Sequence, residues 1–153
     1  MQSFAALLGP AQVIDLKART SRAAVTELVK TFPGPGMALR RQMIRAVLER
    51  EATMSTGIGN GIAVPHARLE KLSRIHLALG RSQRGIDFQA VDGRKASIVA
   101  LIITPTSQVN AYLQLLASVL WTFSDDATQG QILSAPNPKT VLAALARRRT
   151  VAF

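Results

Sequence analysis

The pattern of apolar and polar residues predicts two helices in the first third of the chain. Side chains recur at helical spacing over residues 21–32 and 37–52, and Thr20 offers an N-cap for the first helix. The Pro-Gly-Pro-Gly segment at residues 33–36 separates the two helices. The positions on neighbouring turns are Val25, Leu28, Val29 and Phe32 in the first helix, and Leu39, Met43, Ala46, Val47 and Arg50 in the second.

Strands are predicted where short apolar runs are bounded by glycine, proline or polar residues. These runs are residues 13–16, 62–64, 75–79, 85–88 and 96–103. The pair Asp92-Gly93 favours a hairpin turn between the last two. From about residue 108 the chain is predicted to be helical, with Val109, Leu113, Leu116 and Leu120 on one stripe and a last short helix over residues 141–145. We therefore expect one α/β domain over residues 1–153, with a mixed β-sheet flanked by helices.

Composition narrows the class of protein. The 153 residues, 48% of them apolar, suffice for one domain with a sizeable core. No cysteine is present, which excludes disulfides, thiolate metal sites and cysteine nucleophiles. The first residues do not read as a signal peptide, and the longest apolar run, residues 98–103, is too short to span a bilayer. A cytoplasmic protein without a membrane span is expected.

The net charge of +10 raises the question of polyanionic partners. The basic residues are scattered, however, and the one run, residues 147–149, is expected to close a helix, where cations favour the helix dipole. Aromatic and basic residues are not interleaved as in RNA-binding sheets. The sequence therefore does not favour nucleic acid as a partner.

The stretch TGIGNGIAVPHAR, residues 56–68, is the strongest candidate for a site. Its alternating glycines follow a helix and precede a strand, the reverse of a dinucleotide-binding turn, and no Gly-Lys-Ser/Thr follows them. Such a loop can expose backbone N–H groups to an anion. Pro65 restricts Val64 to extended geometry, so His66 is expected at the end of a strand, where the chain leaves the sheet.

Cations and hydroxyl groups surround His66 in the sequence, namely Arg50, Ser55, Thr56 and Arg68. Arginine and backbone donors stabilise the negative charge of a phosphoryl group, so this composition favours phosphoryl chemistry on the ring. The alternative is a histidine that only caps the strand through a hydrogen bond. His76, within the strand predicted at residues 75–79, is expected to be structural or on the surface.

The stretch REATMSTGIGNGIAVPHAR, residues 50–68, resembles the active-site signature of the IIA phosphocarrier domains of the bacterial phosphoenolpyruvate-dependent phosphotransferase system (PTS), in the mannitol/fructose and nitrogen-regulatory class. GIDF at residues 85–88, VDG at 91–93, ITP at 103–105 and YLQLLA at 112–117 fall in the family's order and spacing. The resemblance covers nearly the whole chain and implies the fold of the mannitol/fructose IIA domains.

The resemblance implies a phosphohistidine relay, as one component of a phosphotransferase system, that needs no cofactor or metal. His66 would accept a phosphoryl group from HPr-like phosphocarrier protein and pass it to a IIB domain, or hold it as a regulatory state. A chain without cysteine cannot itself be a IIB domain of this class. The resemblance implies catalytic roles for His66, Tyr112, Arg50 and Thr56, and phosphoryl or partner binding for Ser55, Asn60 and Arg68.

Two features depart from the family. Tyr112 stands where the family usually has a second histidine, and the positive charge is unusual for such domains. Tyr112 can donate a hydrogen bond to a phosphoryl oxygen, or it can simply pack beside Leu116 and Val119. We expect either a working carrier, with the nitrogen-regulatory type favoured over sugar transport, or a degenerate module that regulates a partner protein by binding.

Overall fold

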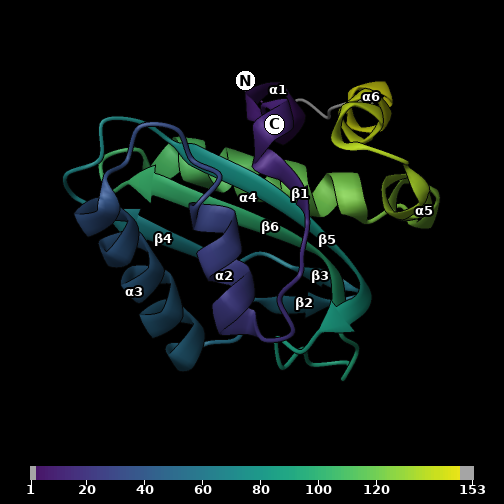
Figure 1. The fold of residues 1–153 in the computed structure, drawn as a ribbon, viewed down its shortest axis with the longest axis horizontal. Coiled ribbons are helices and arrows are strands. Elements are labelled where there is room, and N and C mark those ends of the chain that lie inside the picture. The colour runs from purple at the N-terminus through teal and green to yellow at the C-terminus, as the bar shows by residue number, and fades with distance from the viewer. Residues whose placement is uncertain (1–2, 149–153) are drawn as a thin grey trace.

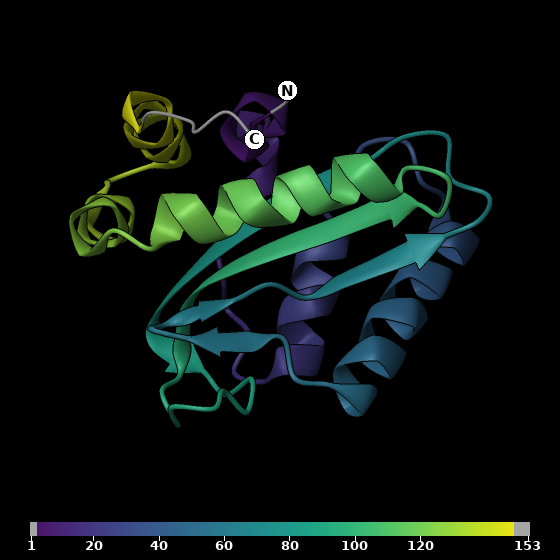
Figure 2. The same ribbon diagram turned by 180° about the vertical axis from the view of Figure 1, so that it is seen from behind.

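A computed structural model describes residues 3–148, which form three layers with a sheet in the middle. The six strands are β1 (Val13–Asp15), β2 (Gly57–Gly59), β3 (Ile62–Ala63), β4 (His66–Leu69), β5 (His76–Ile86) and β6 (Ala96–Pro105). The helices are α1 (Phe4–Leu7), α2 (Ser21–Val29), α3 (Met37–Thr53), α4 (Val109–Phe123), α5 (Asp126–Ser134) and α6 (Pro138–Arg147), with a 3₁₀ turn at Pro10–Gln12. Helices α2 and α3 cover one face and α4 the other (Figure 1, Figure 2).

The sheet is mixed, with strand β6 at its centre. Strand β5 runs antiparallel to one side of β6, and β1 runs parallel to β5 at the edge. On its other side β6 pairs in parallel with β3 and then with β4, and β2 extends β3 as an antiparallel neighbour. The expected mixed sheet flanked by helices is confirmed.

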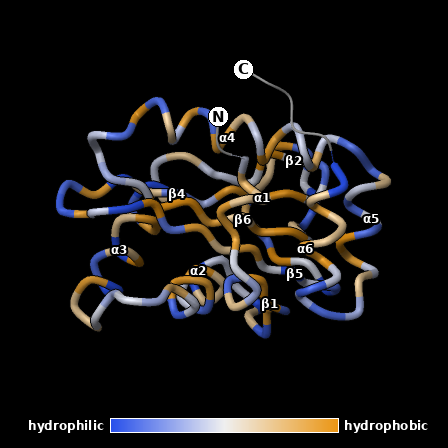
Figure 3. The backbone as a smooth tube through the Cα atoms, turned by 90° about the horizontal axis from the view of Figure 1, so that it is seen from above, coloured by the Kyte–Doolittle hydropathy of each residue, from blue (hydrophilic) through white to orange (hydrophobic). Residues whose placement is uncertain are grey.

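The alternation of side chains along β6 divides the core in two. Ile98, Ala100 and Ile102 pack against α4 and the C-terminal helices, whereas Val99, Leu101 and Ile103 pack under α2 and α3. Both faces of the strand are buried, which explains its continuous apolar run. The tube coloured by hydropathy shows the same apolar middle layer (Figure 3).

Several predicted elements differ from the observed ones. The segments predicted as strands 75–79 and 85–88 belong largely to the single strand β5, which continues through Gly80 with a register shift between Arg81 and Ile86. Residues 87–95 connect β5 to β6, so Asp92-Gly93 does not form a two-residue hairpin turn; the Gly93 N–H instead bonds the Ala90 carbonyl. The short elements α1, the 3₁₀ turn and β2 were not predicted, because three or four residues carry too little periodicity.

The stripe predicted for α4 is wrong. Leu115, Val119 and Phe123 are buried, whereas Val109, Leu113 and Leu120 lie among the exposed apolar residues. At the end of the chain α6 closes at Arg147, Arg148 follows as its C-cap, and Arg149 lies outside the described residues. Among residues 3–148 no helix is both long enough and apolar enough to cross a membrane.

Candidate functional site

His66 occupies the first position of β4, not the end of the preceding strand as predicted. Buried Pro65 lies between β3 and β4, which both pair with β6, and its carbonyl accepts a hydrogen bond from the Ile102 N–H, at 3.1 Å. His66 then pairs with Ile102 in the parallel ladder. The chain therefore stays paired with β6 on both sides of the proline. The sequence analysis had expected it to leave the sheet at this point.

Side chains of α3, β4 and the start of α4 line a cavity of about 590 Å³. Strand β4 contributes His66 at its first position and Arg68 two residues on, and α3 contributes Arg50 from its last turn. Tyr112, in the first turn of α4, closes the cavity from the other side. Four of the seven residues named from the sequence, His66, Arg68, Arg50 and Tyr112, thus line one cavity.

The hydrogen bond of His66 defines its tautomer. Ring atom Nδ1 lies 3.0 Å from the Val64 carbonyl oxygen, which can only accept, so Nδ1 carries the proton. The lone pair of the neutral ring is consequently on Nε2. The sequence also allowed a histidine that only caps the strand through a hydrogen bond. Such a bond is observed, because the ring donates to the Val64 carbonyl.

Electrostatics keep His66 neutral. Burial lowers the pKa of His66 below its ordinary value, and the nearby guanidinium groups of Arg50 and Arg68 lower it further, against opposing effects of the Val64 carbonyl and Glu51. Near neutral pH the ring is therefore a nucleophile and not a cation.

Tyr112 lies directly against the histidine. The two ring centroids are 5.3 Å apart at an interplanar angle of 37°, and the Arg68 guanidinium carbon is 6.0 Å from the tyrosine ring centroid. Burial raises the pKa of Tyr112, so its hydroxyl keeps its proton and remains a hydrogen-bond donor. The ring also packs on the core beneath α4. Packing and proximity to His66 are therefore both observed.

Ser55, Thr56 and Asn60 are not among the residues that line the cavity. The buried Thr56 donates its N–H and hydroxyl to the Glu51 carboxylate, at 3.1 and 2.5 Å, and its carbonyl accepts from the Val64 N–H. Ser55 donates to the Phe88 carbonyl. These contacts anchor the glycine segment that leads to His66. Glu51 therefore acts as a positioning residue. The sequence analysis did not single it out, although it lies within the signature at residues 50–68.

Asn60 lies at the tip between β2 and β3. It adopts a positive φ of 56°, its N–H donates to Asp92 at 2.8 Å, and its side-chain oxygen accepts from Arg94. Neighbouring Gly59 has φ 88°, and an added Cβ would lie 3.0 Å from the same Asp92 carboxylate. The alternating glycines therefore form a tight strand turn against the 87–95 connection, and the Asn60 N–H at this tip binds a carboxylate of the chain itself.

His76 is buried in the sheet and is not a surface residue. It is buried against Phe32, with ring centroids 5.0 Å apart, on the α2–α3 side of the sheet. Within residues 3–148 no group of three or more histidine or acidic side chains is placed to hold a metal ion.

The protein is thus a three-layer α/β domain. It holds a neutral histidine in an arginine-lined cavity at the edge of its sheet. Residues 11–148 match the family described as "Phosphoenolpyruvate-dependent sugar phosphotransferase system, EIIA 2". The chain belongs to this family, as the resemblance implied.

Relatives from both branches of the family are similar to this chain. The PTS fructose-specific EIIA component of Haloferax volcanii is 34% identical, over 70% of each chain. The nitrogen regulatory protein of Bradyrhizobium diazoefficiens is 26% identical, over 92% of each. The PTS fructose-specific EIIABC component of Bacillus subtilis is 28% identical over 84% of this chain, which spans only 20% of that protein.

Solved structures show the same fold. Nitrogen regulatory protein IIA-Ntr of Neisseria meningitidis superposes with a TM-score of 0.82 at 21% identity, covering 92% of this chain and 97% of that one. The mannitol IIA enzyme of Escherichia coli, in complex with phosphorylated mannitol IIB enzyme, gives 0.75 at 20% identity, covering 92% and 98%.

Proposed function

We propose that the protein is a phosphohistidine carrier in which Nε2 of His66 accepts a phosphoryl group from HPr-like phosphocarrier protein. The observation that carries this proposal is the neutral ring, held by the Nδ1–H bond to Val64 with its Nε2 lone pair free, among Arg50, Arg68 and Tyr112. Family membership supports the same role.

The transfer is an in-line displacement at phosphorus. The Nε2 lone pair forms the new N–P bond while the N–P bond to the carrier's histidine breaks and its electron pair returns to that ring. Arg50 and Arg68 neutralise the charge on the equatorial oxygens, and the Tyr112 hydroxyl donates to one of them. Nδ1 of His66 keeps its proton throughout, so the step requires no other base and no cofactor.

The next acceptor is a IIB domain or a regulatory target protein. The mannitol IIA relative in complex with IIB supports the first, and the nitrogen regulatory relative, matched over 92% of both chains, supports the second. We favour the nitrogen-regulatory role because that sequence match covers 92% of both chains, against 70% of both for the fructose-specific EIIA component.

A second candidate function follows from Tyr112. With no second histidine in the cavity, the protein would instead be a degenerate IIA module that regulates a partner by binding and carries no phosphate. Tyrosine cannot become a cation beside the phosphoryl group as histidine can.

Phosphoryl transfer distinguishes the two functions. The purified chain is incubated with phosphoenolpyruvate, enzyme I and the phosphocarrier of the same genome, and its intact mass is followed alongside His66→Ala, His76→Gln and Tyr112→His. A carrier gains one acid-labile phosphoryl group in the parent and in His76→Gln, and none in His66→Ala. Labelling of Tyr112→His alone identifies the degenerate module, and labelling that persists in His66→Ala refutes the assignment of His66.

A further inference from the structure

A second cavity, of about 360 Å³, lies at the opposite end of α3 from Arg50. The loop before α3 and the connection between β4 and β5 line it, with Gly36, Leu39, Lys71, Arg74 and His76 as the residues that matter here. At a rise of about 1.5 Å per residue, Met37 and Arg50 are about 20 Å apart along the helix. The two cavities have no lining residue in common. We call the second one the α3 amino-end pocket.

The first turn of α3 supplies backbone donors to this pocket. Gly36 is the N-cap and makes no side-chain capping bond, and the first turn contains no acidic residue. The first N–H groups of a 17-residue helix are thus left without a side-chain acceptor, and the helix dipole adds positive potential there.

His76 supplies an independent indication of a ligand. The side chain is more than nine-tenths buried, with 7% of its surface exposed, yet it lines the pocket. Its ring packs on Phe32, and the ring nitrogens, which have no hydrogen-bond partner within residues 3–148, are not fully buried. They are therefore open to the pocket and able to bond a group that enters it.

The charges around the pocket are all positive. Lys71 and Arg74 line it from the β4–β5 connection, and Arg74 donates to the Pro33 carbonyl at 2.8 Å. Burial lowers the pKa of His76, and the charges of Arg74 and Arg40 lower it further. Arg40 donates to the carbonyls of Val29, Phe32 and Pro35 and so fixes the loop in place. None of the residues that line the pocket is acidic.

We propose that the α3 amino-end pocket binds a phosphate group, either as free phosphate or as the phosphomonoester of a small metabolite. Helix N–H groups, two cations and an imidazole converge on one volume, which is the donor set that a tetrahedral dianion takes in proteins. The volume also has room for an organic group attached to the phosphate. The pocket is separate from the proposed phosphoryl relay and does not depend on it.

The two histidines make the test direct, because each cavity contains one of them. The ring resonances of His66 and His76 are followed by NMR during titration with inorganic phosphate, with glycerol 2-phosphate, and with sodium chloride at matched ionic strength. The expected result is a saturable shift of the His76 resonance with phosphate or the monoester and none with chloride. A response to phosphate alone identifies the free anion, and a tighter response to glycerol 2-phosphate identifies a monoester.

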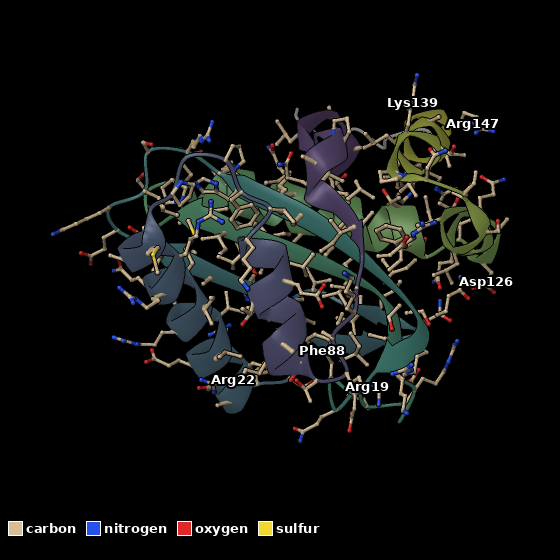
Figure 4. The ribbon with its side chains drawn as sticks, viewed as in Figure 1. Arg19, Arg22, Phe88, Asp126, Lys139 and Arg147 are labelled. Carbon is tan, nitrogen blue, oxygen red and sulfur yellow. The ribbon has the colours of Figure 1, made fainter. Side chains whose placement is uncertain are left out.

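Variants separate the pocket from general charge effects. Lys71→Gln is expected to weaken the His76 response at least threefold, whereas Lys139→Gln, at an exposed position on α6 far from α3, leaves it unchanged (Figure 4). Gly36→Asp places a carboxylate at the helix N-cap, where an added Cβ meets no atom within 4 Å. It should weaken binding at least tenfold while the melting temperature is unchanged or higher. A shift at His66 alone, or a linear shift at His76 that chloride reproduces, overturns the proposal.

Discussion

At the scale of single residues, the side chain of Tyr112 is the unusual feature of the cavity. The ring contributes packing to the core beneath α4, whereas the hydroxyl contributes a donor beside His66. These contributions can be separated, because phenylalanine retains the ring and removes only the hydroxyl.

Tyr112→Phe is expected to slow phosphorylation of His66 by about ten- to a hundredfold, since a hydrogen bond to a charged group contributes about 1.5–3 kcal/mol. The initial rate of phosphoryl transfer from the carrier measures this effect. The thermal midpoint should move by less than about 2 °C, because the packing of the ring persists. Equal rates for the two proteins would show that the hydroxyl does not contact the transferred group.

At the scale of elements, α4 shows why the sequence predicted the wrong buried face for a helix. Apolar residues occur on nearly all sides of this helix, so two interleaved stripes have the required spacing. Docking on β6 buries the stripe containing Leu115 and Val119 and leaves Leu113 and Leu120 exposed.

Truncating a leucine of the buried stripe should destabilise the protein much more than truncating a leucine of the exposed stripe. Leu115→Ala removes a side chain that is 1% exposed and should lower the free energy of unfolding by about 2–5 kcal/mol. Leu113→Ala, at 53% exposure, is the matched control and should change it by less than about 0.5 kcal/mol. Urea unfolding of both variants gives the comparison, and similar losses would contradict the observed orientation of α4.

At the scale of the whole molecule, both histidines have their pKa lowered by burial from a value of 6.5. The unfolded chain therefore binds protons at a higher pH than the folded one. Stability is fully present above about pH 6.5 and declines as the pH falls below it. The lowered pKa values of Asp92 and Asp125, from 3.8, affect stability only at more acidic pH.

The urea concentration at the midpoint of unfolding is accordingly expected to decrease as the pH is lowered from 7.5 to 5, well before the carboxylates titrate. The double variant His66→Gln, His76→Gln serves as the control, because without the imidazole rings this decline should largely disappear. A parent protein whose midpoint stays constant or rises over the same range would contradict the inferred burial of the two rings.

The sequence by itself determined the order of the main elements, the mixed α/β class and the family, and it singled out His66 as the candidate phosphoryl acceptor. These follow from local patterns: apolar periodicity, the prolines and glycines that end elements, and a signature of nineteen consecutive positions at residues 50–68. The roles assigned to His66, Tyr112, Arg50 and Arg68, and to Ser55, Thr56 and Asn60, rest on the resemblance and stay predictions.

Only the tertiary structure decided which side chains meet. Tyr112 reaches His66 because α4 crosses the sheet beside β4, and Glu51 reaches Thr56 because the chain turns after α3. His76 lies open to the α3 amino-end pocket because β5 passes beneath the loop at residues 33–36. Such contacts depend on how elements pack and how the chain turns between them, and periodicity within one element contains no information about its neighbours.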